Sequence, residues 1–268
     1  MVDYHVHSNV SFDAYTDMVD CAVYARDIGL DEICFTEHHE IDYPYPDAKP
    51  EYDYELYNRQ IERVRREVPE IIIKRGVEVG LIPTSIQKIS DDLKDKEFDF
   101  IIASQHAVGG KDPWWGDFFD GKTVREGQRE YLQEILKCIS LFDHYDVIGH
   151  IGYIDKYLKK SNTKKDEAPF QYHDFPELID ELLKKVIGAG KGIEVNTSNY
   201  YIYGYPTPHK SILKRYVELG GEILTMGSDA HSAEVIGHCF LQAQELIKEC
   251  GAKYICTFTQ RKPTFIKL

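Results

Sequence analysis

The sequence predicts an α/β protein that folds as a TIM-like (β/α) barrel, with residues 1–268 forming a single domain. Short runs of β-branched and aromatic residues alternate along the chain with amphipathic helical patterns, as in proteins built around a parallel sheet. Seven or eight such units in 268 residues fit a closed barrel better than an open, doubly wound sheet, which is the alternative. No internal repeat and no long linker divides the sequence.

In chain order, the strands are predicted from runs that are rich in apolar and β-branched residues. The first is VDYHV at 2–6, and YICTF at 254–258 is an eighth candidate. The seven predicted strands cover residues 2–6, 32–36, 71–79, 99–104, 146–151, 192–196 and 222–227. Amphipathic patterns between and after them predict helices that include residues 53–67, 127–142, 174–187 and 232–249.

Two long connections follow the second and fourth strands, at residues 37–52 and 106–126. Both are rich in Tyr, Trp, Phe, Asp, Pro and Gly. In a βα barrel, such loops lie at the carboxyl ends of the strands, where active sites are built. The polar stretch KKSNTKKDEAP at 159–169 is expected to be a surface excursion.

Composition and charge limit the classes of function. The formal net charge of −13 argues against nucleic acid as the main partner, because phosphate backbones are bound by clustered lysines and arginines. A small anionic substrate remains compatible, since a bound metal supplies local positive charge. No apolar run approaches the roughly 20 residues of a membrane span, and no signal peptide is visible. The six cysteines contain no C-x-x-C pair and are expected to be buried free thiols of a cytoplasmic protein.

Histidines and carboxylates stand at or just past the carboxyl ends of the predicted strands. His5 and His7 are two residues apart, so both point to the same side of a strand, and Asp229 and His231 repeat this spacing. Because the carboxyl ends of barrel strands share one rim, these side chains are expected to converge. The predicted metal ligands are His5, His7, Asp13, His38, Glu78, His106, His150, Asp229 and His231.

Imidazole and carboxylate ligands without thiolate favour zinc, manganese or iron. Nine ligands are too many for one ion and suffice for two or three if Glu78 bridges a pair. Three divalent ions would bring about +6, and the carboxylates of Asp13, Glu78 and Asp229 would leave about +3. A phosphate dianion would suit that charge.

The remaining histidines are expected at helix ends, in caps, in loops or on a helix: His144, His173, His209 and His238. His39 either reaches the rim of the pocket or has a structural role. Glu37 is expected to orient a metal ligand rather than to bind metal itself.

Six segments follow one another in order: H-x-H at 5–7, TEHH at 36–39, GVEVG at 76–80, SQH…GGKDPWW between 104 and 115, GH at 149–150 and GSDAH at 227–231. Together they resemble the polymerase-and-histidinol-phosphatase (PHP) family, and within it the monofunctional histidinol-phosphatases. The resemblance extends from residue 3 to about residue 240. It implies a distorted (β/α)7 barrel, which agrees with seven predicted strands and an eighth candidate.

The resemblance also implies three metal sites. The first set is His5, His7, Glu78 and Asp229, the second is Glu78, His106 and His150, and the third is Asp13, His38 and His231. Glu78 would bridge the first two sites. Some family members carry histidine where this chain has Asp13.

The activity that the resemblance implies is hydrolysis of L-histidinol phosphate to L-histidinol and phosphate, a step of histidine biosynthesis. A hydroxide held between two ions would attack phosphorus in line, since metal binding lowers the pKa of water towards about 7 in the best cases. No covalent phosphoenzyme is required. Asp229, or a metal-bound water, would return a proton to the leaving alkoxide. The catalytic candidates are Glu78, Asp229 and His231.

Histidinol-phosphatases of this type place one arginine after the GH of the fifth strand and another after the E-x-N-T of the sixth. The corresponding positions here are Lys156 and Tyr201. Lysine keeps the charge but loses the bidentate fork, and tyrosine supplies one neutral donor. Another small phosphate ester is therefore compatible with this site.

The organic half of histidinol phosphate carries an ammonium group and an imidazole. Candidates on the two long loops to hold a cation and a flat ring are Asp42, Asp47, Tyr43, Tyr45, Trp114 and Trp115. The alternative is that these aromatic residues only pack the loops together.

Three other classes of function stay open. A nuclease of the same family would use the same metals but would need a basic groove, which the charge of −13 does not favour. A hydrolase of carbon–nitrogen bonds on a metal barrel would usually need fewer ions. The third class is a catalytically silent metal-binding or interaction module.

Overall fold

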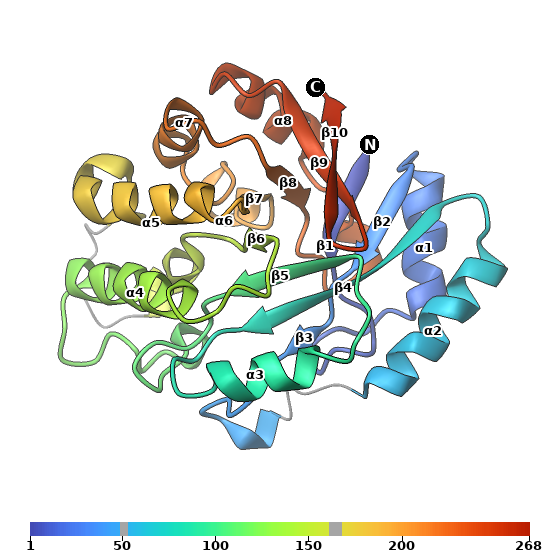
Figure 1. The fold of residues 1–268 in the computed structure, drawn as a ribbon, viewed down its shortest axis with the longest axis horizontal. Coiled ribbons are helices and arrows are strands. Elements are labelled where there is room, and N and C mark those ends of the chain that lie inside the picture. Colours follow the sequence, from blue (N-terminus) through green and yellow to red (C-terminus); the bar gives the residue numbers. More distant parts are fainter. Residues whose placement is uncertain (49–52, 161–167) are drawn as a thin grey trace.

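Residues 1–48, 53–160 and 168–268 are described by the computed structural model, and they form a barrel of parallel strands surrounded by helices (Figure 1). Around the barrel the strands are β1 (Val2–Val6), β2 (Glu32–Phe35), β4 (Ile72–Gly80), β5 (Phe100–Ser104), β6 (Val147–Ile148), β7 (Gly192–Asn196) and β8 (Leu224–Gly227). Every neighbouring pair is parallel. The predicted barrel of seven strands is therefore confirmed.

The barrel is nearly closed, because the segment after β8 returns to β1. The backbone N–H of His7 donates to the carbonyl of Ala230 at 2.9 Å, and that of Asp229 donates to His5 at 2.8 Å. These bonds rule out the open, doubly wound sheet. They also bring His5 and His7 beside Asp229 and His231, although more than 200 residues of chain separate the two pairs.

A two-residue strand, β3 (His38–His39), continues the sheet beyond the end of β2 and pairs with β4. His38 lies opposite Glu78 in this ladder. The sequence assigned residues after 36 to a loop, because a run of two histidines carries no strand pattern. The short pairing fixes the backbone of His38 at the same level of the barrel as Glu78.

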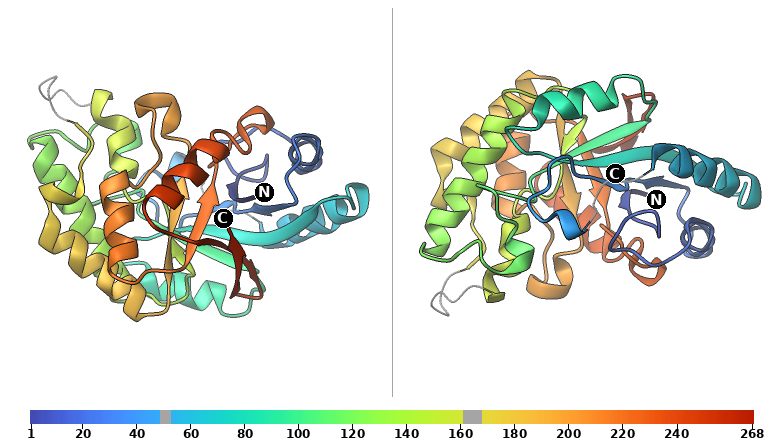
Figure 2. Two further views of the ribbon diagram at one scale, coloured as in Figure 1. Left: turned by 90° about the horizontal axis from the view of Figure 1, so that it is seen from above. Right: turned by 90° about the horizontal axis from the view of Figure 1, so that it is seen from below.

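The helices around the barrel are α1 (Met18–Asp27), α2 (Tyr54–Glu67), α3 (Ile86–Leu93), α4 (Val124–Ile139), α5 (Pro176–Gly188), α7 (Lys210–Glu218) and α8 (Phe240–Glu249), with a short α6 (Tyr200–Tyr203). The two views of Figure 2 show them arranged on the outside of the strands. The four predicted helical patterns correspond to α2, α4, α5 and α8. The short helices α1, α3 and α7 were not predicted.

Helix boundaries differ from the predictions for local reasons. α4 begins before residue 127 because Thr123 and Glu126 form a reciprocal capping box, in which the Glu126 carboxylate accepts from the Thr123 N–H at 2.7 Å. α8 begins at Phe240 rather than at 232. Gly237 and Cys239 have φ angles of 67° and 56°, which no α-helix can contain.

The eighth strand candidate lies outside the barrel sheet. β9 (Tyr254–Thr259) pairs antiparallel with β10 (Lys262–Lys267) in a separate hairpin. The ring of Phe258 packs against Tyr4 and Phe100, with centroids 6.3 and 4.9 Å apart. Because Phe100 is the first residue of β5, the hairpin covers the amino-terminal end of the barrel and leaves the opposite rim to the long loops.

Other expectations concern the whole chain. The six cysteines are free, and all except Cys239 are buried, as predicted. In the parts of the chain that the structure describes, no helix has the length and apolar character needed to cross a membrane. Most of the predicted surface excursion at 159–169 lies outside the described residues, because 161–167 belong to the undescribed part.

Candidate metal centre

A first cluster of possible ligands joins β1 to the segment after β8 through Glu78. Nε2 of His5 lies 3.1 Å from Nε2 of His7. Oε2 of Glu78 is 3.3 and 3.5 Å from these two nitrogens, and Oδ1 of Asp229 is 3.6 and 3.5 Å from them. Four ligands placed about 2.1 Å from a tetrahedral ion are about 3.4 Å apart. All five distances are therefore close to those of one coordination shell.

A second cluster lies on the other oxygen of Glu78. Oε1 is 2.8 Å from Nε2 of His150 and 3.3 Å from Nε2 of His106. The two imidazole nitrogens are themselves 3.3 Å apart. Glu78 is fully buried and thus presents one oxygen to each cluster, as a bridging carboxylate does.

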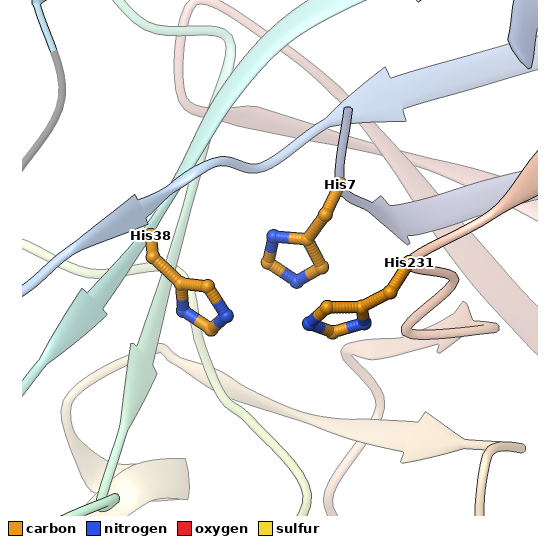
Figure 3. Close-up of side chains that lie close together, drawn as sticks. All are labelled: His7, His38 and His231. Atoms are coloured by element: carbon orange, nitrogen blue, oxygen red, sulfur yellow. The ribbon is translucent and has the colours of Figure 1, made fainter. Parts of the chain in front are cut away.

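The third cluster contains Asp13, His38 and His231. Figure 3 shows the rings of His7, His38 and His231 directed towards one another. Oδ2 of Asp13 is 3.5 Å from Nε2 of His38 and 3.3 Å from Nε2 of His231. The rings of His7 and His38 stack with centroids 4.2 Å apart, so this cluster adjoins the first. The structure thereby brings together all nine predicted ligands.

Several donor atoms at the centre are buried without a hydrogen bond, which tests whether the residues fit metal ions. They include Oε2 of Glu78, Oδ1 of Asp13 and Nδ1 of His38. His38 Nδ1 is 2.9 Å from Glu78 Oε2, yet the pair lacks hydrogen-bond geometry. Each unsatisfied buried polar atom costs about 1–3 kcal/mol. Imidazole and carboxylate donors around such atoms fit divalent zinc, manganese or iron.

The electrostatics of the cluster keep its carboxylates ionised. Burial would raise the pKa values of Glu78 and Asp229, but His5 beside Glu78 and Lys156 beside Asp229 hold both well below the usual range. Burial lowers the pKa of His5, and the carboxylates of Glu194 and Glu78 more than reverse this, so that it lies well above the usual value. Cations at this centre would therefore compete with protons on the imidazoles.

Oxygen atoms on the outer nitrogens orient several of the rings, and those of His5 and His231 are two examples. Nδ1 of His5 is 2.6 Å from Oε1 of Glu194. Nδ1 of His231 donates to the backbone carbonyl of Asp229 at 3.0 Å. Such contacts fix the tautomer, so that Nε2 of each ring faces the centre.

Glu37 contacts the ligands through two serines. Its carboxylate accepts from the N–H of Ser8 at 3.1 Å and from the hydroxyl of Ser11. Oγ of Ser11 lies 3.3 Å from Nδ1 of His7 and accepts the N–H of His38 at 3.1 Å. Burial raises the pKa of Glu37 to about 7. Its position agrees with the orienting role that the sequence suggested.

Two buried glutamates near the ligands were not among the predicted site residues. Glu194 in β7 accepts the N–H of His150 at 2.8 Å through Oε2. Glu40, just after β3, contacts Nδ1 of His106 through Oε1. A Cβ on Gly80 would lie 1.7 Å from Oε2 of Glu40, so only glycine leaves room for this carboxylate. The signals in the sequence were a charge inside the apolar run GIEVN and a second glutamate in TEHHE.

Residues of all three clusters line a pocket of about 560 Å³ at the carboxyl ends of the strands, namely Asp13, His38, His106, His150, Asp229 and His231. Aromatic residues line much of it: Phe12, Tyr15, Tyr43, Trp114, Trp115, Tyr153 and Tyr157. Lys156, from the 3₁₀ segment Tyr153–Lys160 after β6, places Nζ 2.8 Å from Oδ2 of Asp229. The hydroxyl of Ser198 donates to the same oxygen at 3.2 Å.

The predicted substrate contacts divide into two groups. Lys156, Tyr43, Trp114 and Trp115 line this pocket, whereas Asp42, Asp47, Tyr45 and Tyr201 do not. Asp42 is exposed, accepts from the Ser85 hydroxyl at 2.8 Å and pairs with Lys88 at 2.5 Å. Its left-handed backbone (φ 59°) belongs to a turn at the start of the loop. The prediction that Asp42 holds the substrate is wrong, because its charge is neutralised outside the pocket.

Tyr201 is also outside the pocket. Its side chain is 59% exposed, and its ring stacks on His238 with centroids 3.9 Å apart. The short helix α6 carries Tyr201 on the outer side of the segment after β7. This corrects the prediction of a phosphate contact at this position.

Among the other predictions for histidines, the one for His238 is wrong, because His238 lies in the turn before α8 rather than on a helix. Nε2 of His39 lies 2.8 Å from Asp92 in α3, and His39 does not line the pocket, so its structural alternative holds. His209 caps α7 by accepting the N–H of Ser211 at 3.2 Å, as expected for a capping residue.

Comparisons with known proteins agree with this geometry. The family described as PHP domain matches residues 3–198. A protein of Lactococcus lactis subsp. lactis named histidinol-phosphatase is 30% identical over 265 residues, which cover 97% of this chain and 95% of that protein. The crystal structure of histidinol phosphate phosphatase from the same organism, complexed with zinc, L-histidinol and phosphate, has a TM-score of 0.88 at 28% identity and covers 98% of each chain. A solved structure from Listeria monocytogenes, 17% identical, shares the fold with a TM-score of 0.71 and covers 90% of this chain and 99% of that chain.

Proposed function

The chain belongs to the PHP domain family, and on this basis we propose that it is a metal-dependent phosphomonoesterase that hydrolyses L-histidinol phosphate to L-histidinol and phosphate. The observation that carries the proposal is the buried carboxylate of Glu78, which faces one set of imidazoles with each oxygen. It lies beneath a substrate-sized pocket that is lined by His106, His150 and Asp229. The likeness to a phosphatase crystallised with zinc, L-histidinol and phosphate supports it.

Two to three divalent ions, zinc, manganese or iron, would be held by the three clusters. The proposed ligand sets are His5, His7, Glu78 and Asp229; Glu78, His106 and His150; and Asp13, His38 and His231. When bound, such ions lower the pKa of water and stabilise the negative charge of the phosphoryl group in the transition state. Glu78 and His231 contribute to catalysis by holding these ions.

Lys156 would bind the phosphoryl oxygens. Among the described residues, Lys156 is the one lysine or arginine that lines the pocket. Its ammonium group lies beside Asp229 at the edge of the clusters. Because Tyr201 lies elsewhere, phosphate binding would depend on Lys156 and on the ions.

Asp229 would carry the proton during hydrolysis. The pKa of its carboxyl lies well below the usual value, despite burial, because of Lys156 and the neighbouring histidines. The ionised carboxylate can accept a proton from the attacking water as the new P–O bond forms. It can then return that proton to the histidinol oxygen as the ester P–O bond breaks.

We also propose that the protein acts in the cytoplasm on a small molecule and not on nucleic acid. Six free cysteines suit a reducing compartment. The net charge of −13 disfavours binding of the phosphodiester backbone of a nucleic acid. Residues 1–268 would form one catalytic domain.

A substrate panel tests this function. The zinc- or manganese-loaded protein is expected to release phosphate from L-histidinol phosphate with a higher kcat/KM than from generic monoesters, and to leave diesters and amides intact. Equal rates on generic monoesters would support the proposed phosphatase activity but contradict L-histidinol phosphate as its specific substrate. Cleavage of nucleic acid or amides alone would contradict the proposal.

A further inference from the structure

One wall of the pocket carries a buried carboxylate, Asp112, whose hydrogen bonds go to none of the nine proposed metal ligands. We infer that Asp112, with Glu40 on the same wall, recognises the ammonium group of the organic half of the substrate. The inference rests on the proposed phosphatase function and names its substrate class, which is phosphate monoesters of cationic amino alcohols.

Asp112 is 3% exposed and lines the pocket. Its Oδ2 accepts from the hydroxyl of Tyr43 at 2.7 Å. Its Oδ1 accepts from the hydroxyl of Tyr153 at 3.1 Å and from the N–H of Trp114 at 2.8 Å. These neutral donors hold the carboxylate in one orientation, but they leave its charge uncompensated.

Glu40 adds a second negative charge to this wall. It is also 3% exposed and lines the pocket, and its Oε2 is buried without a hydrogen-bond partner, while Oε1 contacts His106. Among the residues that the structure describes, no lysine or arginine forms an ion pair with Glu40 or Asp112. His106 partners one oxygen of Glu40, whereas Asp112 has only neutral donors. Burying unpaired charge is costly, so a cationic ligand would be attracted to Asp112.

The arrangement also separates two ends of the pocket. Nζ of Lys156 lies 5.8 Å from the centre of the Tyr153 ring, and the hydroxyl of that ring reaches Asp112. An anion beside Lys156 and a cation beside Asp112 would therefore sit on either side of Tyr153. This polarity matches an ester with phosphate at one end and an amine near the other.

Aromatic faces complete the cation site. Trp114 and Trp115 line the pocket and are 52% and 51% exposed. Nε1 of Trp115 donates to the hydroxyl of Tyr43 at 3.3 Å, and Tyr43, which also lines the pocket, donates to Asp112 through this hydroxyl. Indole and phenol rings attract ammonium groups through their faces. The sequence pointed to a cation site on these loops but assigned its charge to Asp42 and Asp47, neither of which lines the pocket. Asp42 pairs with Lys88 instead.

The test compares L-histidinol phosphate with the same ester lacking its amino group. The metal-loaded wild-type protein should prefer the amino ester by about 10- to 100-fold in kcat/KM, the usual value of a hydrogen bond to a charged group. Asp112→Asn should bring this ratio towards one. Asp117→Asn is the matched control: it lies on the same loop, pairs with Lys111 and does not line the pocket, so the ratio should persist.

Each alternative outcome separates the two proposals. Equal wild-type rates on the two esters would overturn the cation site and leave the phosphatase intact. An equal loss on both esters in Asp112→Asn would assign Asp112 a structural role only and overturn the inference. Calorimetry with the wild-type protein measures the affinities for L-histidinol and for its deaminated analogue. This measurement depends neither on the folding of a variant nor on turnover. Equal affinities would again contradict the cation site, whereas tighter binding of L-histidinol without phosphatase activity would remove only the proposed reaction.

Discussion

At the scale of single residues, Glu78 contributes most to the site, because its two oxygens face different clusters. Glu78→Gln should therefore lose more bound metal than His38→Asn, which removes a ligand of the third cluster. Elemental analysis of both variants measures this, with exposed His144→Asn as a control that should keep its metal. Activity should fall by about 10²–10³ or more in both ligand variants. Equal metal loss would contradict the bridging position of Glu78.

Lys156 gives a second residue-scale prediction. Lys156→Ala should raise KM for the phosphate ester by about 10- to 100-fold, since it removes one charged donor. Lys156→Arg should be tolerated or should improve binding, because a guanidinium can donate two parallel hydrogen bonds to phosphate. Steady-state kinetics of the wild type, Lys156→Ala and Lys156→Arg measure these changes in KM. An alanine variant with unchanged KM would show that this ammonium group does not bind phosphate.

The residues of the metal centre could be predicted because they stand at strand ends, where barrel geometry alone determines that they converge. Glu78 and His150 are examples, since Glu78 lies near the carboxyl end of β4 and His150 lies two residues after β6. Asp112 and Asp42 show the limit of this reasoning. Both lie on long loops, and only the tertiary path of the chain determines that one faces the pocket and the other pairs with Lys88.

At the scale of elements, the segment Tyr153–Lys160 positions Lys156. Asp155, the residue before Lys156, fixes this segment to α4 and to Phe170 through hydrogen bonds. The Asp155 carboxylate accepts from Gln128 in α4 at 2.7 Å and from the N–H of Phe170 at 3.0 Å. Burial raises the pKa of Asp155 to about 8. Its folded-state pKa thus exceeds the unfolded value of about 3.9.

This difference in pKa predicts how stability changes with pH. Between about pH 4 and pH 8 the folded protein retains a proton that the unfolded chain has lost, so the contribution of Asp155 to stability decreases as pH rises, by up to about 1.4 kcal/mol per pH unit. Asp155→Asn should flatten the pH dependence of the free energy of unfolding in this window. Urea unfolding of wild type and variant at pH 5 and pH 8 measures it. Parallel pH profiles would show that Asp155 does not titrate in this range.

The elements themselves were predictable to different degrees. Long periodic segments such as α2 and α4 carry enough pattern to be recognised, whereas α3 has eight residues and too few turns. The run 254–258 is a strand, as its composition indicates. Composition does not determine which strand it pairs with, and its partner is β10 rather than a strand of the barrel.

At the scale of the whole molecule, ligands from all sides of the barrel meet at one centre, so metal should stabilise the entire fold. Metal at about 100 times its Kd should add about 2.7 kcal/mol to the free energy of unfolding. Chelation should accordingly lower Tm by several degrees, and Glu78→Gln should show a smaller shift. Thermal unfolding with and without zinc measures both. An unchanged wild-type Tm would indicate that the clusters do not bind metal in the folded state.

The most direct measurement is phosphate release from L-histidinol phosphate as metal is titrated into the chelated protein. The three clusters predict negligible turnover without metal and a rise that saturates at two to three ions per chain, with Glu78→Gln remaining nearly inactive throughout. Full turnover by the metal-free protein, or no phosphate release after saturation with zinc and with manganese, would contradict a metal-dependent histidinol-phosphate phosphatase centred on Glu78.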